Sequence, residues 1–259
     1  MKLLTGKIVY IFGASGGIGF QIAKKVALEE GKLVLFCRDI KKLKKLMSKN
    51  KLLAELILTC DVANKKHTYK QINKAIQITK KVDLVFYCIG IGQQEAILEH
   101  RDTVWDKTID INLNAAYRII KSVIPSMIQN KYGRIVIISS RFGKMGASGL
   151  VAYSASKHGL AGLVKSTALE LAKYNITVNA VCPGRVETNL TSKTAQILST
   201  RLKKSKNYIL KKFNQENAIK RLITPDEVAD LSLFLGSNKA GAITGELFGI
   251  TGGLSSIYE

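Results

Sequence analysis

The sequence predicts an α/β fold: one domain built on a doubly wound, seven-stranded parallel sheet with helices on both faces. Short apolar, β-branched runs alternate with longer amphipathic segments along the entire chain. The short runs are almost continuously apolar, as strands covered on both faces are. A length of 259 residues suits a single domain of this class. Right-handed crossovers between the strands would give the Rossmann topology.

Two kinds of segment define the expected elements. Strands are predicted at Lys7–Phe12, Leu33–Cys37, Glu55–Thr59, Leu84–Cys88, Arg134–Ser139, Thr177–Val181 and Leu247–Ile250. Helices are predicted near residues 17–30, 39–49, 64–80, 104–131, 152–174 and 225–236. No internal repeat and no linker rich in proline or serine interrupts this alternation, so residues 1–259 are expected to form one domain.

One excursion departs from the alternation, between about residues 188 and 222. It carries nine basic residues and a single acid, Glu216, and it is too long for an ordinary connection between a strand and a helix. Its place after the carboxyl end of a strand favours a mobile helical lid over a substrate pocket. A solvated surface excursion is the alternative.

The composition limits the classes of partner. The net charge of +21 would attract phosphates without regard to sequence. However, no pattern of interleaved aromatic and basic residues appears, and most of the charge is carried by lysines that suit solvated helix faces. Nucleic-acid binding is therefore not the expected function, although an affinity for acidic partners stays open.

The cysteines and the apolar runs bear on location. Cys37, Cys60, Cys88 and Cys182 are widely spaced and form no Cys-x-x-Cys pair, so we expect reduced core thiols in a cytoplasmic protein and no metal site. No apolar run reaches the roughly 18 residues of a transmembrane helix, so no membrane association is expected.

A glycine-rich turn follows the first strand. The segment Gly13-Ala14-Ser15-Gly16-Gly17-Ile18-Gly19 lies between that strand and a helical pattern, which is the order found at dinucleotide-binding sites. Its glycines allow a tight turn and a close approach of backbone to a pyrophosphate, while the helix N-terminus offers free N–H groups and partial positive charge. A purely structural turn is the alternative. The predicted cofactor contacts here are Gly13, Ser15, Gly16, Gly17, Ile18 and Gly19.

The end of the second strand indicates which dinucleotide binds. NAD enzymes place an acid there to bind the ribose hydroxyls, whereas this chain has Cys37 followed by Arg38. Arg38 could hold a 2′-phosphate in a bidentate way, with Lys41 and Lys42 nearby. Asp39 is expected to cap the next helix. The sequence therefore favours NADP(H), although a slip of one residue would bring Asp39 to the ribose and favour NAD.

A tyrosine and a lysine share one face of the helix near residues 152–174. Tyr153 and Lys157 are separated by one helical turn. Ketone reduction needs a proton for the oxygen, and a neighbouring ammonium should lower the pKa of the phenol toward working pH. Ser140 lies at the end of a predicted strand, at the sheet edge where α/β ligands bind. We expect it to orient the carbonyl oxygen of the substrate.

The chain resembles the classical short-chain dehydrogenases/reductases over nearly its entire length. The matching motifs, in family order and spacing, are Gly13-x-x-x-Gly17-x-Gly19, Cys60-Asp61-Val62, Ile111-Asn112-Leu113, Ser140, Tyr153-x-x-x-Lys157, Val181-Cys182-Pro183-Gly184, Ile243-Thr244-Gly245 and Gly252-Gly253. Around Tyr153 and Pro183 the pattern is most similar to β-ketoacyl-(acyl-carrier-protein) reductases and to ketoreductases of aromatic polyketide synthesis.

The resemblance implies a role for each motif. Tyr153 would donate the proton, Lys157 would lower its pKa and bind the nicotinamide ribose, and Ser140 would position the carbonyl. Asn112 would hold a water that links Lys157 to solvent. Further cofactor contacts are implied at Asp61, Val62, Cys88, Gly90, Pro183, Gly184, Val186 and Thr188. The family is usually homotetrameric, which the resemblance carries over to this chain.

Two positions depart from the family pattern. The family usually has Asn-Asn-Ala-Gly after the fourth strand, where this chain has Tyr87-Cys88-Ile89-Gly90, and Thr at the position of Phe12. The two changes lie on adjacent predicted strands. A hydrogen bond between them could therefore be replaced by apolar packing with little loss of stability. The adenine-ribose contact at Cys88 is the one that this exchange affects.

The substrate is less well defined. A β-ketoacyl thioester is favoured, presented by an acidic acyl carrier protein that a basic rim of Lys131, Lys173 and the lid would attract. Arg141 and Arg185 would suit a substrate carboxylate or phosphate if both face the pocket, and a subunit interface is their alternative. A dehydrogenase of polyols, sterols or other secondary alcohols is a second hypothesis. A nucleotide-sensing or nucleic-acid-binding Rossmann protein is a third.

Overall fold

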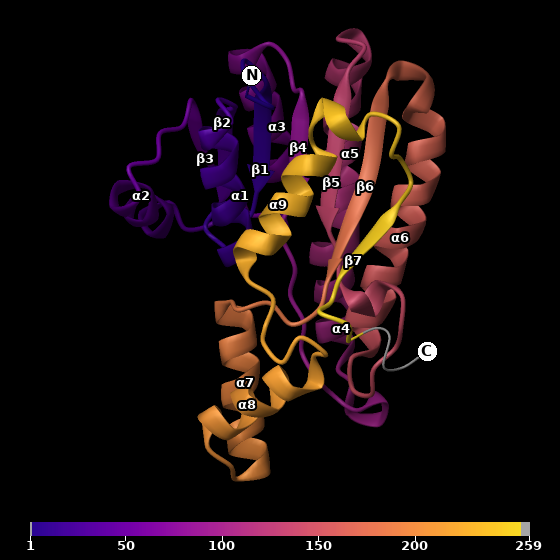
Figure 1. Ribbon diagram of the computed structural model, residues 1–259. Helices are drawn as coiled ribbons and strands as arrows, with labels where there is room; N and C mark the ends of the chain where they lie inside the picture. The colour runs from indigo at the N-terminus through magenta and orange to yellow at the C-terminus, as the bar shows by residue number, and fades with distance from the viewer. Residues whose placement is uncertain (1, 255–259) are drawn as a thin grey trace.

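A computed structural model describes residues 2–254 of the chain; residues 1 and 255–259 of the expected domain lie outside the described part. Seven parallel strands form one sheet in the order β3-β2-β1-β4-β5-β6-β7 (Figure 1). The strands are β1 Ile8–Phe12, β2 Lys32–Cys37, β3 Leu56–Thr59, β4 Leu84–Tyr87, β5 Gly133–Ile138, β6 Ile176–Pro183 and β7 Leu247–Ile250. The predicted doubly wound sheet is confirmed, and its winding reverses between β1 and β4.

Helices cover both faces of this sheet. The helices are α1 Gly17–Leu28, α2 Ile40–Lys49, α3 Lys65–Thr79, α4 Asp102–Ile109, α5 Ala115–Gln129, α6 Val151–Leu171, α7 Asn189–Leu202, α8 Lys206–Glu216 and α9 Pro225–Leu235. Helices α3, α5 and α6 pack against one face, and α1, α2 and α9 pack against the other. The central strands β1, β4, β5 and β6 are fully buried, which explains why the sequence shows continuous apolar runs there in place of alternation. The edge strands β3 and β7 are only partly buried.

Alternate residues of β1 belong to two different cores. Tyr10 and Phe12 pack toward α3, α5 and α6, whereas Val9 and Ile11 pack toward α1 and α9. Phe12 stacks on Phe36 of β2, with 4.2 Å between ring centres. The family threonine at residue 12 is thus replaced by aromatic packing between β1 and β2.

The helix expected at residues 104–131 has an irregular centre. Helix α4 passes through a π-helical turn, Asp110–Asn114, before it continues as α5. A π-turn inserts one extra residue into a helix and is frequent at functional sites. The strand expected at Thr177–Val181 also extends further, because β6 continues to Pro183.

The basic excursion between residues 188 and 222 is helical, as predicted. Helices α7 and α8 project beyond the carboxyl edge of the sheet (Figure 1). They share a small apolar core of their own, formed by Ala195, Ile209 and Phe213. This helical segment therefore packs around its own core and adds little to the two cores of the sheet.

Candidate active site

The glycine-rich turn connects β1 to α1 in the expected way. Gly13 has a φ of +86°, and a Cβ atom there would lie 3.0 Å from the carbonyl oxygen of Cys88. A Cβ atom on Gly19 would overlap the carbonyl of Gly13, so helix and turn approach closely. Gly16 is the N-cap of α1 and leaves the first N–H groups of the helix to an incoming ligand. This cradle fits the pyrophosphate of a dinucleotide.

Two cofactor positions that are far apart in the sequence meet at this turn. A Cβ atom on Gly17 would lie 3.1 Å from Cγ2 of Thr188, the N-cap of α7. Val186 forms an isolated parallel bridge with Ile223, which fixes the chain just before Thr188. The glycine turn and the start of α7 are therefore direct neighbours.

The end of β2 carries exposed cations. Arg38, Lys41 and Lys42 all lie on the surface there. The Asp39 carboxylate accepts a hydrogen bond from the Lys42 backbone at 2.9 Å, which confirms its predicted role as the N-cap of α2. The acid that could have bound a ribose is therefore engaged in capping.

The adenine positions implied by the family lie at the end of β3. Val62 is buried, and its carbonyl accepts a hydrogen bond from Nη1 of Arg118 at 3.2 Å. The Asp61 side chain accepts a hydrogen bond from the Ala63 backbone at 3.2 Å. Cys88, which directly follows β4, is half-buried, and its Cβ would lie 3.3 Å from a Cβ atom on Gly19. Asp61 and Val62 thus lie beside the end of β3, whereas Cys88 lies against the glycine turn on the other side of β1.

The predicted catalytic residues converge at the carboxyl edge of β5. Tyr153 and Lys157 lie on the same side of α6, where the Lys157 Nζ is 5.6 Å from the centre of the tyrosine ring. The Ser140 hydroxyl lies close enough to the Tyr153 phenol to affect its pKa, and it accepts a hydrogen bond from the Phe142 backbone at 3.2 Å. Lys157 is only 2% exposed, and its ammonium donates to the Ile138 carbonyl at 3.2 Å. The tyrosine, serine and lysine thus form one cluster.

Burial controls the ionisation of this cluster. It raises the pKa of Tyr153, and the hydrogen bond from Ser140 opposes that rise in part. Burial also lowers the pKa of Lys157 to about 8. The sequence analysis expected Lys157 to lower the pKa of the phenol. In the structure the largest influence on the phenol is desolvation, and Ser140 supplies the opposing hydrogen bond.

Asn112 belongs to the same cluster but is engaged with protein groups. It is fully buried in the π-turn, and its side chain accepts from the Ile91 N–H and donates to the Ile91 carbonyl, both at 2.8 Å. Its amide also donates to the Ser156 hydroxyl at 2.9 Å, and that hydroxyl donates to the Tyr153 carbonyl at 2.7 Å. Asn112 therefore clamps the loop after β4 to α6.

Two glycines on either side of Ile91 form the floor under the catalytic side chains. A Cβ atom on Gly90 would lie 3.3 Å from the Lys157 Nζ, and one on Gly92 would lie 2.8 Å from the Tyr153 ring. The sequence analysis missed Gly92 and Ser156. Gly92 was visible only as one of a pair of glycines, and Ser156 gave no signal apart from its place between Tyr153 and Lys157.

The two arginines considered for substrate binding have different surroundings. Arg185 pairs with Glu216 of α8 at 3.0 Å and lies over the Phe213 ring at 3.8 Å. Arg141 is buried beside Ser140 and lies 4.5 Å from the centre of the Phe142 ring. A substrate anion would have to compete with Glu216 for Arg185, because the single acid of the lid already neutralises this cation.

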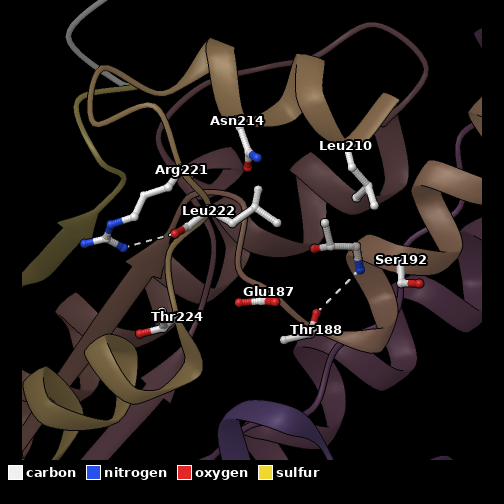
Figure 2. A pocket seen from close by; sticks show the side chains of 9 residues that line it. Glu187, Thr188, Ser192, Leu210, Asn214, Arg221, Leu222 and Thr224 are labelled. Carbon is white, nitrogen blue, oxygen red and sulfur yellow. Dashed lines mark hydrogen bonds between the residues drawn. The ribbon is translucent and has the colours of Figure 1, made fainter. Parts of the chain in front are cut away.

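A pocket of about 450 Å³ lies at the base of the lid (Figure 2). Its walls come from the start of α7, from α8 and from the segment before α9. They carry hydroxyl, amide and leucine side chains together with one carboxylate and one guanidinium: Glu187, Thr188, Thr191, Ser192, Leu210, Asn214, Arg221, Leu222 and Thr224. Thr188 therefore faces both the glycine turn and this pocket.

The chain as a whole is similar to known proteins. A family model described as enoyl-(acyl carrier protein) reductase matches residues 13–255. The 3-oxoacyl-[acyl-carrier-protein] reductase of Rickettsia felis is 36% identical over 253 residues, which cover 97% of this chain and 98% of that protein. The chain belongs to the short-chain dehydrogenase/reductase family.

Solved structures agree with this membership in the short-chain dehydrogenase/reductase family. A variant of actinorhodin polyketide ketoreductase, determined with NADPH, superposes with a TM-score of 0.91 at 30% identity and covers 96% of this chain and 97% of its own. Levodione reductase superposes with a TM-score of 0.92 at 26% identity and covers 98% and 100%.

Within residues 2–254, no group of three or more His, Cys, Asp and Glu side chains is arranged to hold a metal ion. Over the same residues, no helix combines the length and apolar character needed to cross a membrane.

Proposed function

We propose that this chain uses NADPH to reduce a ketone to a secondary alcohol, and that its substrate is a β-ketoacyl thioester of fatty-acid or polyketide synthesis. The observation that carries the proposal is the convergence of Ser140, Tyr153 and the buried Lys157 ammonium at the carboxyl edge of β5. Two hydroxyl donors at one point suit an oxygen that gains negative charge and then becomes an alcohol.

The chain's own groups would supply the proton and the charge. Ser140 and Tyr153 would both donate hydrogen bonds to the substrate carbonyl oxygen, and Tyr153 would then transfer its proton. Burial keeps the pKa of Tyr153 above its usual value, so the phenol is protonated at neutral pH, as a proton donor must be. The Lys157 ammonium would stabilise the phenolate that remains. NADPH, when bound, supplies the hydride.

The choice of NADPH over NADH rests on the end of β2. The exposed Arg38, Lys41 and Lys42 would hold a 2′-phosphate, while Asp39 is occupied with capping α2. We propose cofactor contacts at the glycine turn and Arg38, at Asp61, Val62, Cys88 and Gly90, at Tyr153 and Lys157, and at Pro183, Gly184, Val186 and Thr188. Michaelis constants for the two cofactors test this assignment, and a preference for NADH would overturn it.

The favoured partner is an acidic acyl carrier protein that presents the thioester. The net charge of +21 and the basic segment between residues 188 and 222 support this proposal. Lys131 and Lys173 do not support it, because they come just before β5 and β6 and so lie at the amino edge of the sheet, opposite the catalytic cluster. If it is correct, kcat/KM for a carrier-bound substrate falls steeply with added salt, whereas kcat/KM for a small thioester changes little. We also propose a cytoplasmic homotetramer, which sedimentation analysis would test.

A substrate panel tests the reaction itself. The oxidation of NADPH is followed with acetoacetyl thioester, crotonyl thioester, a cyclic diketone and a sugar ketone. We expect turnover of the acetoacetyl thioester and none of the crotonyl thioester, because the proposed donors serve a carbonyl oxygen. Preference for the diketone or the sugar ketone would favour the second hypothesis, a dehydrogenase of other secondary alcohols. Salt-sensitive nucleic-acid binding without any turnover would favour a non-catalytic protein.

A further inference from the structure

Tyr87 is one of the residues at which this chain departs from its family, and its hydroxyl has a specific partner. It is the last residue of β4 and is 1% exposed. Its hydroxyl donates a hydrogen bond to the carbonyl of Ile111, inside the π-turn. Burial raises the pKa of Tyr87 strongly, so the hydroxyl stays neutral and able to donate.

π-helical segments are rare and occur as single turns at functional sites. Hydrogen bonds from neighbouring elements, such as that of Tyr87, therefore help to hold the π-turn. A second tie comes from Arg118 of α5. Its guanidinium pairs with the Asp110 carboxylate at the start of the turn and donates to the Val62 carbonyl at 3.2 Å. The turn is therefore fixed from β4 on one side and from the end of β3 on the other.

The residue that follows Ile111 leads directly to the catalytic cluster. Asn112 makes two hydrogen bonds of 2.8 Å to the backbone of Ile91. Gly90 and Gly92 flank Ile91, and they lie against the Lys157 ammonium and the Tyr153 ring. If the Ile111 carbonyl shifted, the adjacent Asn112 would shift with it. Because Asn112 bonds the Ile91 peptide, the glycines that flank Ile91 would then move relative to Lys157 and Tyr153.

We propose that Tyr87 is a positioning residue: by holding the Ile111 carbonyl it fixes the π-turn, so that Asn112 keeps the loop Gly90–Gly92 in place beneath Lys157 and Tyr153. The role rests on the ketone reduction proposed above. Tyr87 touches neither the substrate nor the reacting atoms, and it acts only through Asn112.

The substitution Tyr87→Phe tests the role, because it removes one hydroxyl and keeps the buried ring. The chain offers a matched control in Tyr10→Phe. Tyr10 is also buried, on the adjacent strand β1, and its hydroxyl bonds Thr79 at 2.8 Å, at the far end of α3. The melting temperature should decrease by a similar amount in both variants. Only Tyr87→Phe should lower kcat, by about tenfold for a small displacement of catalytic groups, and shift the pH profile of kcat, with little change in KM for NADPH.

Hydrogen exchange gives a readout that needs no turnover. The Ile91 N–H donates to Asn112, so Tyr87→Phe should speed exchange of this amide while Tyr10→Phe leaves it unchanged. Equal kcat, pH profile and Ile91 exchange in the two variants would overturn the positioning role. If the wild-type protein does not reduce ketones, the proposed function is wrong. Faster exchange of the Ile91 amide in Tyr87→Phe would then still support the positioning role of Tyr87.

A second variant covers the case in which Tyr87→Phe does not fold. Arg118→Lys keeps the charge but can hold only one of the two partners, Asp110 and Val62. It should speed Ile91 exchange and lower kcat in the same direction. Unchanged exchange and unchanged kcat in this variant would overturn the proposal as well.

Discussion

The Lys157 ammonium lies 5.6 Å from the centre of the Tyr153 ring and donates its hydrogen bond to the Ile138 carbonyl at 3.2 Å. The lysine is thus held beside the tyrosine by the end of β5, with its charge buried. In this arrangement Ser140 is the side chain that opposes the rise in the pKa of the phenol.

Removal of the phenol should abolish the reaction. We expect Tyr153→Phe to lower kcat for acetoacetyl thioester by at least about 100-fold, because general-acid catalysis contributes a factor of this size. NADPH affinity, measured by fluorescence titration, should stay close to that of the wild type. Retention of near-normal kcat would show that another group donates the proton.

The pH dependence should follow Lys157. Burial lowers the pKa of its ammonium to about 8, so the lysine is charged below this pH and neutral above it. We therefore expect kcat/KM for ketone reduction to fall as pH rises through about 8. In Lys157→Arg the guanidinium stays charged, so the remaining activity should be flat over the same range. A wild-type profile without a decline above this pH would contradict the assignment.

The close packing of Gly92 against the Tyr153 ring can be tested by adding one methyl group at Gly92. A Cβ atom on Gly92 would lie 2.8 Å from the Tyr153 ring, so Gly92→Ala should displace the ring and lower kcat by roughly tenfold or more. Gly146→Ala is the matched control, because a Cβ atom there would meet nothing within 4 Å. Equal kcat in both variants would mean that the ring can shift without cost.

The ion pair at the lid should control substrate access more than stability. Glu216→Gln removes the charge that neutralises Arg185, and a half-exposed pair of this kind contributes only about 0–1 kcal/mol to folding. We expect faster hydrogen exchange in α7 and α8 with little change in melting temperature. If Arg185 can serve a substrate anion, KM should fall for a ketone that carries a carboxylate and not for its neutral ester.

The cofactor assignment predicts a selective loss. Arg38→Ala should raise KM for NADPH by about tenfold or more, since a bidentate arginine contact to phosphate is among the stronger hydrogen-bonded pairs. KM for NADH should change much less, because NADH lacks the 2′-phosphate. Parallel increases for both cofactors would place Arg38 elsewhere along the binding site.

The sheet and the catalytic cluster could be predicted from the sequence because both depend on local patterns. Buried parallel strands give continuous apolar runs, and spacing by one turn puts Tyr153 and Lys157 on one side of α6. The π-turn at Asp110–Asn114 could not be predicted, because one inserted residue barely alters a helical pattern. The pKa of Tyr153 and the pairing of Arg185 with Glu216 depend on tertiary burial and contact, which no spacing reveals.

Because α7 and α8 share a small apolar core of their own, their sequence can vary independently of the rest of the fold. The two helices pack on each other, while the proton-transfer groups are held by β5, α6 and the loop after β4. Substitutions in the lid can therefore alter which ketone is admitted without disturbing the chemistry. Diversification of substrate range on this framework would be expected to concentrate between residues 188 and 222.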